Sequence, residues 1–221
     1  MKYVWFVLIA AAVFCGSLAP AWADDIASPP WTRYGAGTTW EGWTFSSPSN
    51  PSYPDEGFYN PYGIPSASIT DPVAWLPLGY NSHIGVWVLN PDSSINVTVP
   101  DSLTVGYKEV FTQVTWLPGT VPGGGPTPTV VVHDGDGVYG GTEEDFQVLA
   151  NGWYHAAWLT LLPNNPPVEI VSVSGTAQVG EVFVDTECTA TPPVPEPGMI
   201  VALAGLAGMG LCGLVWRRRR A

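Results

Sequence analysis

The chain has 221 residues, which is enough for one domain of ordinary size with additional terminal segments. Its charges are unevenly divided: Arg33 and Lys108 are the only basic residues between Asp24 and Glu196, whereas all 19 acidic residues lie there. This strongly negative segment disfavours binding to nucleic acid or to an anionic membrane, because both carry negative charge.

Residues 1–23 have the features of a secretory signal peptide. Lys2 gives a positively charged start, and an apolar run from Val4 to Cys15 follows. Ala21 and Ala23 form a small-x-small pattern, which predicts cleavage after Ala23. The alternative, an N-terminal transmembrane helix, requires a longer apolar run than this one.

Residues 24–188 are predicted to form an all-β domain. Short runs of β-branched and aromatic residues alternate there with Pro, Gly, Asn and Asp, and no helical pattern stands out. The predicted strands are 83–89, 94–99, 109–117, 127–132, a hairpin at 146–162 around Asn151-Gly152, 168–179 and 181–188. Many short strands at this spacing indicate an antiparallel β-sandwich of the jelly-roll type, although spacing alone does not give the strand order.

Apolar residues on alternate positions predict which strand faces are buried. Ile95, Val97 and Val99 alternate with Asn96 and Thr98 in the clearest strand. In the strand 109–117, the same period places Val110, Val114 and Trp116 on one face. In the strand 181–188, it places Val182, Val184 and Thr186 on one face and Glu181, Phe183 and Asp185 on the other.

Nine aromatic residues lie between Trp31 and Tyr62, among Ser, Asn, Pro and Gly residues. Aromatic rings flanked by hydrogen-bonding side chains can stack on sugar rings. The candidate carbohydrate-binding residues are Trp31, Tyr34, Tyr53, Tyr59 and Tyr62. Small β domains also fill their cores with aromatic residues, and Trp40, Trp43 and Phe45 are expected to do so.

An acidic stretch, "HDGDGVYGGTEED", offers oxygen ligands of the kind that Ca²⁺ prefers. Its candidate ligands are Asp134, Asp136 and Asp145. The stretch departs from an EF-hand loop, since Val138 and Tyr139 stand where an acidic residue and the invariant glycine belong. A solvated acidic turn is the alternative, and no other cofactor is predicted.

Catalytic signatures are missing from the sequence. His83, His133 and His155 are scattered without the spacing of a zinc site, and no G-x-S-x-G motif occurs. Cys188 is the only thiol of the predicted exported domain, so an internal disulfide is ruled out there. We therefore expect no enzymatic activity, although paired carboxylates brought together from separate strands are not visible in sequence.

The C-terminal part is predicted to be a membrane anchor. Residues 189–198 form a Pro-rich linker, and residues 199–216 are an uncharged apolar segment. As a helix this segment spans about 27 Å, close to the hydrocarbon thickness of a bilayer. Residues 217–221 form a basic tail, which the positive-inside rule places in the cytoplasm.

These three parts together resemble the PEP-CTERM sorting signal of Gram-negative and related bacteria. The residues that carry the resemblance are Val194, Pro195, Glu196 and Pro197 before the apolar segment, and Arg217, Arg218, Arg219 and Arg220 after it. The resemblance implies processing by an exosortase, a membrane peptidase for which the motif is a recognition sequence. It also implies transient anchoring in the inner membrane, followed by transfer to the cell surface or release outside the cell.

Proteins with this signal are often associated with exopolysaccharide. The sequence therefore predicts an exported, non-enzymatic protein of the cell envelope or extracellular matrix. The two alternatives are a carbohydrate-binding module that holds exopolysaccharide and a jelly-roll hydrolase that acts on glycosides.

Overall fold

The computed structural model describes residues 25–49, 53–80, 83–101, 106–118, 127–149 and 152–190. The predicted signal peptide, most of the Pro-rich linker, the predicted membrane helix and the arginine tail lie outside these residues. Within the described part the secondary structure is all β, and no helix there is long and apolar enough to cross a membrane.

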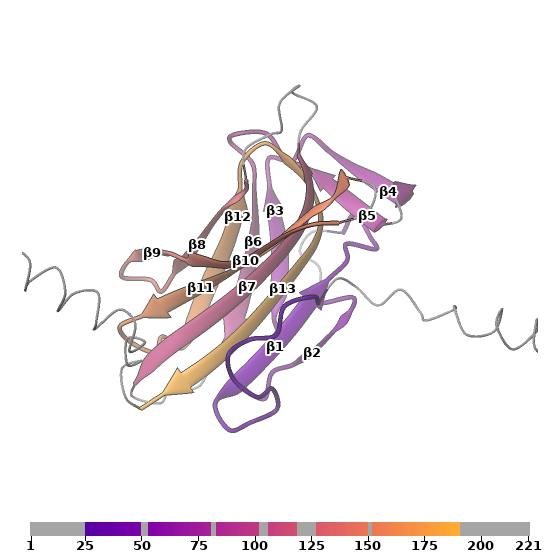
Figure 1. The fold of residues 1–221 in the computed structure, drawn as a ribbon. Coiled ribbons are helices and arrows are strands. Elements are labelled where there is room, and N and C mark those ends of the chain that lie inside the picture. Colours follow the sequence, from indigo (N-terminus) through magenta and orange to yellow (C-terminus); the bar gives the residue numbers. More distant parts are fainter. Residues whose placement is uncertain are drawn as a thin grey trace, which may run out of the picture.

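Two antiparallel sheets form the domain (Figure 1). The eight-stranded sheet contains β1 (Thr38–Trp43), β2 (Gly57–Tyr59), β4 (Ala74–Tyr80), β5 (His83–Val88), β7 (Tyr107–Pro118), β10 (Thr142–Val148), β11 (Tyr154–Leu162) and β13 (Ala177–Thr189). The five-stranded sheet contains β3 (Ser66–Thr70), β6 (Ser94–Pro100), β8 (Thr129–His133), β9 (Val138–Gly140) and β12 (Val168–Ser174). The chain passes repeatedly from one sheet to the other.

The strand order joins segments that are far apart in the sequence. The larger sheet runs β10-β11-β7-β13-β1-β2, and the β4–β5 hairpin attaches to β13. The smaller sheet runs β3-β6-β12-β8-β9. The long strand β13 pairs with β7 on one side, and on the other side first with β5 and then with β1. The last described strand is therefore central to the larger sheet.

The core lies between the sheets and is built from alternate residues of each strand. Ile95, Val97 and Val99 of β6 are fully buried, as their alternation predicts. The predicted inner faces of β7 and β13 are confirmed as well, because Val110, Val114, Trp116, Val182 and Val184 all belong to the core. Burial of each such side chain contributes about 1.5–3 kcal/mol to folding.

The structure confirms every predicted strand region and corrects several details. The run 168–179 is divided at Gly175, so that β12 ends at Ser174 and β13 begins at Ala177. The β10–β11 hairpin is confirmed, but its loop is wider than a two-residue turn, because Val148 pairs with Tyr154. The strands β1 to β4 and β9 have no counterpart among the predicted runs.

Candidate functional site

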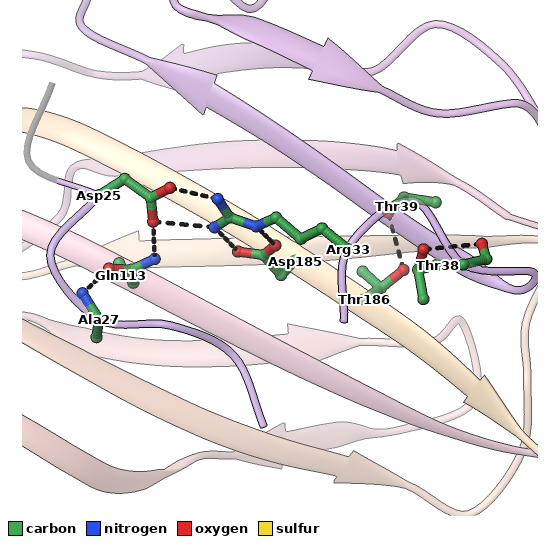
Figure 2. A network of polar contacts seen from close by, with 9 residues as sticks. Asp25, Ala27, Arg33, Thr38, Thr39, Gln113, Asp185 and Thr186 are labelled. Carbon is green, nitrogen blue, oxygen red and sulfur yellow. Dashed lines mark hydrogen bonds and ion pairs between the residues drawn. The ribbon is translucent and has the colours of Figure 1, made fainter. Parts of the chain in front are cut away.

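The segment before β1 covers part of the outer face of the eight-stranded sheet (Figure 2). The backbone N–H of Ala27 donates to Gln113 Oε1 over 2.9 Å, and Gln113 Nε2 donates to Asp25 Oδ1 over 2.8 Å. The Trp31 ring lies edge-on to Phe111, with 6.4 Å between the ring centroids. Because Gln113 and Phe111 belong to β7, these contacts fix the segment on the middle of the sheet.

Arg33 is the centre of this attachment. Its Nη2 atom donates to Asp25 Oδ1 over 2.9 Å and to Asp185 Oδ2, on β13, over 2.7 Å (Figure 2). Its Nη1 atom also donates to Asp25, and its Nε atom also donates to Asp185. The Asp185 side chain is fully buried. Two carboxylates on one planar, five-donor guanidinium form charge-assisted hydrogen bonds with a defined geometry.

The electrostatics follow from burial and pairing. Burial raises the pKa of Asp185 to about 6, although Arg33 acts in the opposite direction. Burial also opposes ionisation of Asp25, but hydrogen bonds from Arg33 and Gln113 outweigh it and lower its pKa. For Arg33, burial disfavours the charged form, yet the two carboxylates raise its pKa overall. Arg33 is therefore a permanent cation within this network.

Three aromatic side chains gather beside Arg33, and we call Tyr34, Trp40 and Tyr59 the outer aromatic cluster. The Tyr34 ring lies 5.2 Å from the Tyr59 ring at 67° and 6.3 Å from the Trp40 ring at 85°. Trp40 of β1 and Tyr59 of β2 are directly paired across the two strands. The Arg33 guanidinium lies 5.6 Å from the centroid of Trp40. Trp40 and Tyr59 come from the β1–β2 edge of the larger sheet, and Tyr34 comes from the segment before β1.

Tyr34 is presented to solvent by an unusual backbone conformation. Its φ of 67° lies in the left-handed region, which is uncommon for a residue other than glycine. Its side chain is 63% exposed, whereas the adjacent residue Arg33 is held by two ion pairs. The attachment of Arg33 thus determines where the Tyr34 ring lies, and an aromatic ring with a hydroxyl group can bind both apolar and polar parts of a ligand.

The structure corrects the expected position of Trp40. Trp43 and Phe45 are buried in the core as predicted, but Trp40 is only half-buried and lies on the opposite face of β1. Successive residues of a strand alternate between faces, so two tryptophans three positions apart must point to opposite sides. Gly57 leaves room for the Trp40 ring, because a Cβ atom there would lie 3.2 Å from its Cη2 atom.

The five candidate carbohydrate-binding residues do not form one site. Tyr34 and Tyr59 are brought together, and Trp31 instead packs against Phe111. Tyr53 is 69% exposed and Tyr62 is also exposed, but neither makes a ring contact with the cluster among the described residues. Trp40, which the sequence predicts in the core, is instead the third member of the cluster.

The candidate calcium ligands are divided between two places. Asp134 and Asp136 lie in the turn from β8 to β9, where Asp134 Oδ1 accepts hydrogen bonds from the backbone N–H groups of Asp136 and Gly137. Asp145 lies on β10 of the other sheet and accepts a 2.8 Å hydrogen bond from Gln147. In the described part of the chain, no three His, Cys, Asp or Glu side chains form a metal-binding group. Calcium binding stays a prediction.

Both predicted processing sites lie outside the described residues. Asp25, the first described residue, follows the predicted cleavage site at Ala21 and Ala23, and Ala190, the last described residue, precedes Val194. A model of the PEP-CTERM protein-sorting motif matches residues 193–220. A search of curated proteins finds no match to the chain. The chain therefore carries a PEP-CTERM protein-sorting motif, which implies export, transient membrane anchoring and processing by an exosortase.

Proposed function

We propose that this exported protein is a non-enzymatic component of the cell surface or extracellular matrix whose β domain binds polysaccharide. The outer aromatic cluster is the proposed binding site. The observation that carries the proposal is the exposed Tyr34 ring, held in a left-handed backbone conformation beside Tyr59 and Trp40. A calcium ion at Asp134, Asp136 or Asp145 is not needed for this site.

The strand order supports a jelly-roll fold for this domain. The strands β11-β7-β13-β1 are neighbours in one sheet and β9-β8-β12-β6 are neighbours in the other. Two facing four-stranded sheets with the first and last strands side by side are the arrangement expected of a jelly roll. On this interpretation β2, β3, β10 and the β4–β5 hairpin extend the sheets at their edges. Jelly rolls are common in lectin domains.

Strained backbone occurs at Tyr34, Phe45 and Asp71, but among the described residues only Tyr34 presents an aromatic ring to solvent from such a conformation, which supports a binding role. A residue held in a sparsely populated backbone region costs about 1–3 kcal/mol and persists only where its surroundings enforce it. Here the surroundings are the ion pairs of Arg33 with Asp25 and Asp185. The Tyr34 side chain is largely exposed, so its burial does little to offset the free-energy cost of this backbone conformation.

The geometry and charge of the site indicate the class of ligand. The Tyr34 and Tyr59 rings meet at a steep angle, so a sugar ring stacked on one would contact the edge of the other. The exported segment has many more acidic than basic residues, and Arg33, which lies beside the cluster, already pairs with two carboxylates. We therefore expect a neutral polysaccharide, because an anionic one would be repelled.

A fluorescence titration tests the proposal. Neutral polysaccharides are added to the protein, and the emission of its tryptophans, which include Trp40, is followed. Tyr34→Ala should weaken binding by roughly two- to tenfold, the range expected for one aromatic contact. Tyr53→Ala is the matched control, since Tyr53 is equally exposed but lies outside the cluster. Absence of binding, or equal losses in both variants, would contradict the proposal.

The expected lack of enzymatic activity is tested in a separate experiment. The same polysaccharides are incubated with the protein, and newly formed reducing ends are measured. A glycosidase requires two carboxyl groups at about 5–10 Å on either side of the bond to be cleaved. We expect no reducing ends, because the two carboxyl groups beside the cluster, Asp25 and Asp185, are both paired with Arg33. Release of reducing ends that tracks with the protein would favour the hydrolase alternative.

A further inference from the structure

Four ionisable side chains lie inside the sandwich, and we call them the buried charge cluster. They are Glu41 of β1, Asp101 after β6, Lys108 of β7 and Glu169 of β12. The side chains of Asp101, Lys108 and Glu169 are fully buried, and Glu41 is fully buried as well. The cluster thus joins both sheets in a region from which water is excluded. Its position on the inner faces separates it from the outer aromatic cluster.

Lys108 lies between two carboxyl groups. Its Nζ atom pairs with Asp101 Oδ2 and lies 2.6 Å from Glu169 Oε1. Cys188 Sγ donates to the same Asp101 Oδ2 atom over 3.1 Å. Both Glu41 carboxyl oxygens and Asp101 Oδ1 have no hydrogen-bond partner among the described residues. A buried charge is normally fully hydrogen-bonded, so this arrangement requires an explanation.

Burial favours the protonated form of two of the acids in the buried charge cluster, Glu41 and Glu169. Burial raises the pKa of Glu169 to about 7, despite the opposing effect of Lys108. Burial also raises the pKa of Glu41 well above its usual range, and the Glu169 charge adds to this. For Lys108, burial disfavours the charge, but Glu169 and Asp101 outweigh it and raise its pKa. Lys108 therefore stays charged, and its Nζ atom pairs with Asp101.

A buried ion pair is costly because both charges lose their hydration. Joining these two groups covalently would remove both charges and leave a neutral amide. We propose that Lys108 Nζ and Asp101 Cγ condense to an intramolecular isopeptide bond, with Glu169 relaying protons. This modification would link the end of β6 in one sheet to the start of β7 in the other.

The reaction is balanced and needs no co-reactant. A proton first moves from the Lys108 ammonium to the Asp101 carboxylate, which gives an amine and a carboxylic acid. The Nζ lone pair then attacks Cγ, the carbonyl oxygen takes a proton from Glu169, and the attacking nitrogen returns one to Glu169. One hydroxyl then takes a proton from Glu169 and leaves as water. The other hydroxyl transfers its proton to Glu169 and becomes the amide carbonyl. Glu169 is regenerated, and one water molecule is released.

The site provides what this condensation requires. The nucleophile and the acid are held in contact, so the reaction is intramolecular and gains the large effective concentration of oriented groups. A carboxyl group with a pKa near neutrality can both donate and accept a proton at physiological pH. The Cys188 thiol donates to Asp101 Oδ2, which helps to polarise the carboxyl group under attack.

Tryptic digestion of the denatured full chain tests the proposal. Trypsin cleaves after unmodified Lys or Arg, and an amide at Nζ of Lys108 abolishes cleavage there. We expect the wild-type chain to stay uncut between Lys108 and Glu109. After chymotryptic cleavage at Tyr107, the peptides that contain Asp101 and Lys108 should remain joined, with a mass lower by one water. Cleavage after Lys108 and an unchanged mass would overturn the proposal.

Three variants assign the roles. Lys108→Arg keeps the charge, cannot form the amide and restores a tryptic site, so it should be cut at that position. Glu169→Gln should be largely unlinked, whereas Glu41→Gln should stay linked, because Glu41 makes no ion pair with Lys108 in the described structure. A fragment spectrum that joins Lys108 to Glu169 would overturn the assignment of Asp101. The wild-type digest decides the question even if a variant does not fold.

Discussion

Arg33 joins parts of the chain that are separated by 152 residues, because it binds Asp185 on the last strand and Asp25 near the start of the domain. Asp185 is fully buried, so its carboxylate depends on this guanidinium for charge balance. The sequence shows Arg33 as one of two isolated cations, but not which carboxylates it meets. That information depends on the position of the N-terminal segment over β13, which only tertiary contacts define.

We predict that Arg33→Ala lowers the free energy of unfolding by about 2–3 kcal/mol, since it leaves a buried carboxylate without its partner. The loss is smaller than for a fully buried pair, because the Arg33 side chain is 21% exposed. Urea unfolding measures the effect. Tyr34→Ala is the control, because its ring is largely exposed and should contribute little. Equal stability of Arg33→Ala and wild type would contradict the assigned role.

The buried acids predict an unusual pH dependence. Burial raises the pKa of Glu169 from 4.5 to about 7 and that of Asp185 from 3.8 to about 6. The folded state therefore binds protons more tightly than the unfolded state does. The free energy of unfolding falls as the pH rises from the ordinary pKa of each group to its raised pKa in the folded state. We expect Tm to be several degrees lower at pH 8 than at pH 5, and Glu169→Gln to reduce the difference. A Tm that rises over this interval would contradict the burial of these groups as acids.

At the scale of elements, sequence pattern predicted the strands that are buried on one face. β6 and β7 were identified because their apolar residues alternate, and the structure confirms their inner faces. β1 was missed because both of its faces are covered: Trp43 packs in the core, and Trp40 packs over Gly57 on the outer side. β2 has only three residues, too few for any period to be recognised.

The order of the strands in the sheets could not be predicted from the sequence. β13 pairs with β7, β5 and β1, and each of these pairings joins residues that are distant along the chain. Register depends on which faces are buried together, and this is a property of both strands. The same limit applies to the candidate site, since Tyr34 and Tyr59 meet only after β1 pairs with β2.

Trp116 of β7 offers a test of the core. It is fully buried and lies 5.8 Å from the Tyr154 ring and 6.2 Å from the Trp158 ring, both on β11. We predict that Trp116→Ala costs about 3–5 kcal/mol through lost burial and the cavity left behind. Leu161→Ala on the same neighbouring strand is the control, because Leu161 is exposed and should change stability little. Denaturant unfolding of the two variants should differ accordingly.

At the scale of the whole molecule, the described β domain lies between two predicted processing sites. The described residues begin at Asp25, which already takes part in the fold, and β13 ends at Thr189, shortly before the sorting motif at residues 193–220. The motif was recognisable in sequence because its residues are adjacent. The outer aromatic cluster was only partly recognisable, because its three rings come from separate segments.

Processing at the C-terminal side can be tested on the exported protein. We predict that intact-mass measurement shows a form without Arg217 to Arg220, because the matched motif implies removal by an exosortase. A chain in which Pro195, Glu196 and Pro197 are replaced by alanine should remain in the membrane fraction. Recovery of an exported wild-type protein that still carries the arginines would contradict this part of the account.

The most direct test of the proposed function is co-sedimentation with insoluble neutral polysaccharide. The wild-type protein should be found in the pellet, and a Tyr34→Ala, Tyr59→Ala double variant should remain in the supernatant. Tyr53→Ala should behave as the wild type does, because Tyr53 is exposed outside the cluster. If the double variant sediments as well as the wild type, or if no protein sediments at all, polysaccharide binding by the outer aromatic cluster is contradicted.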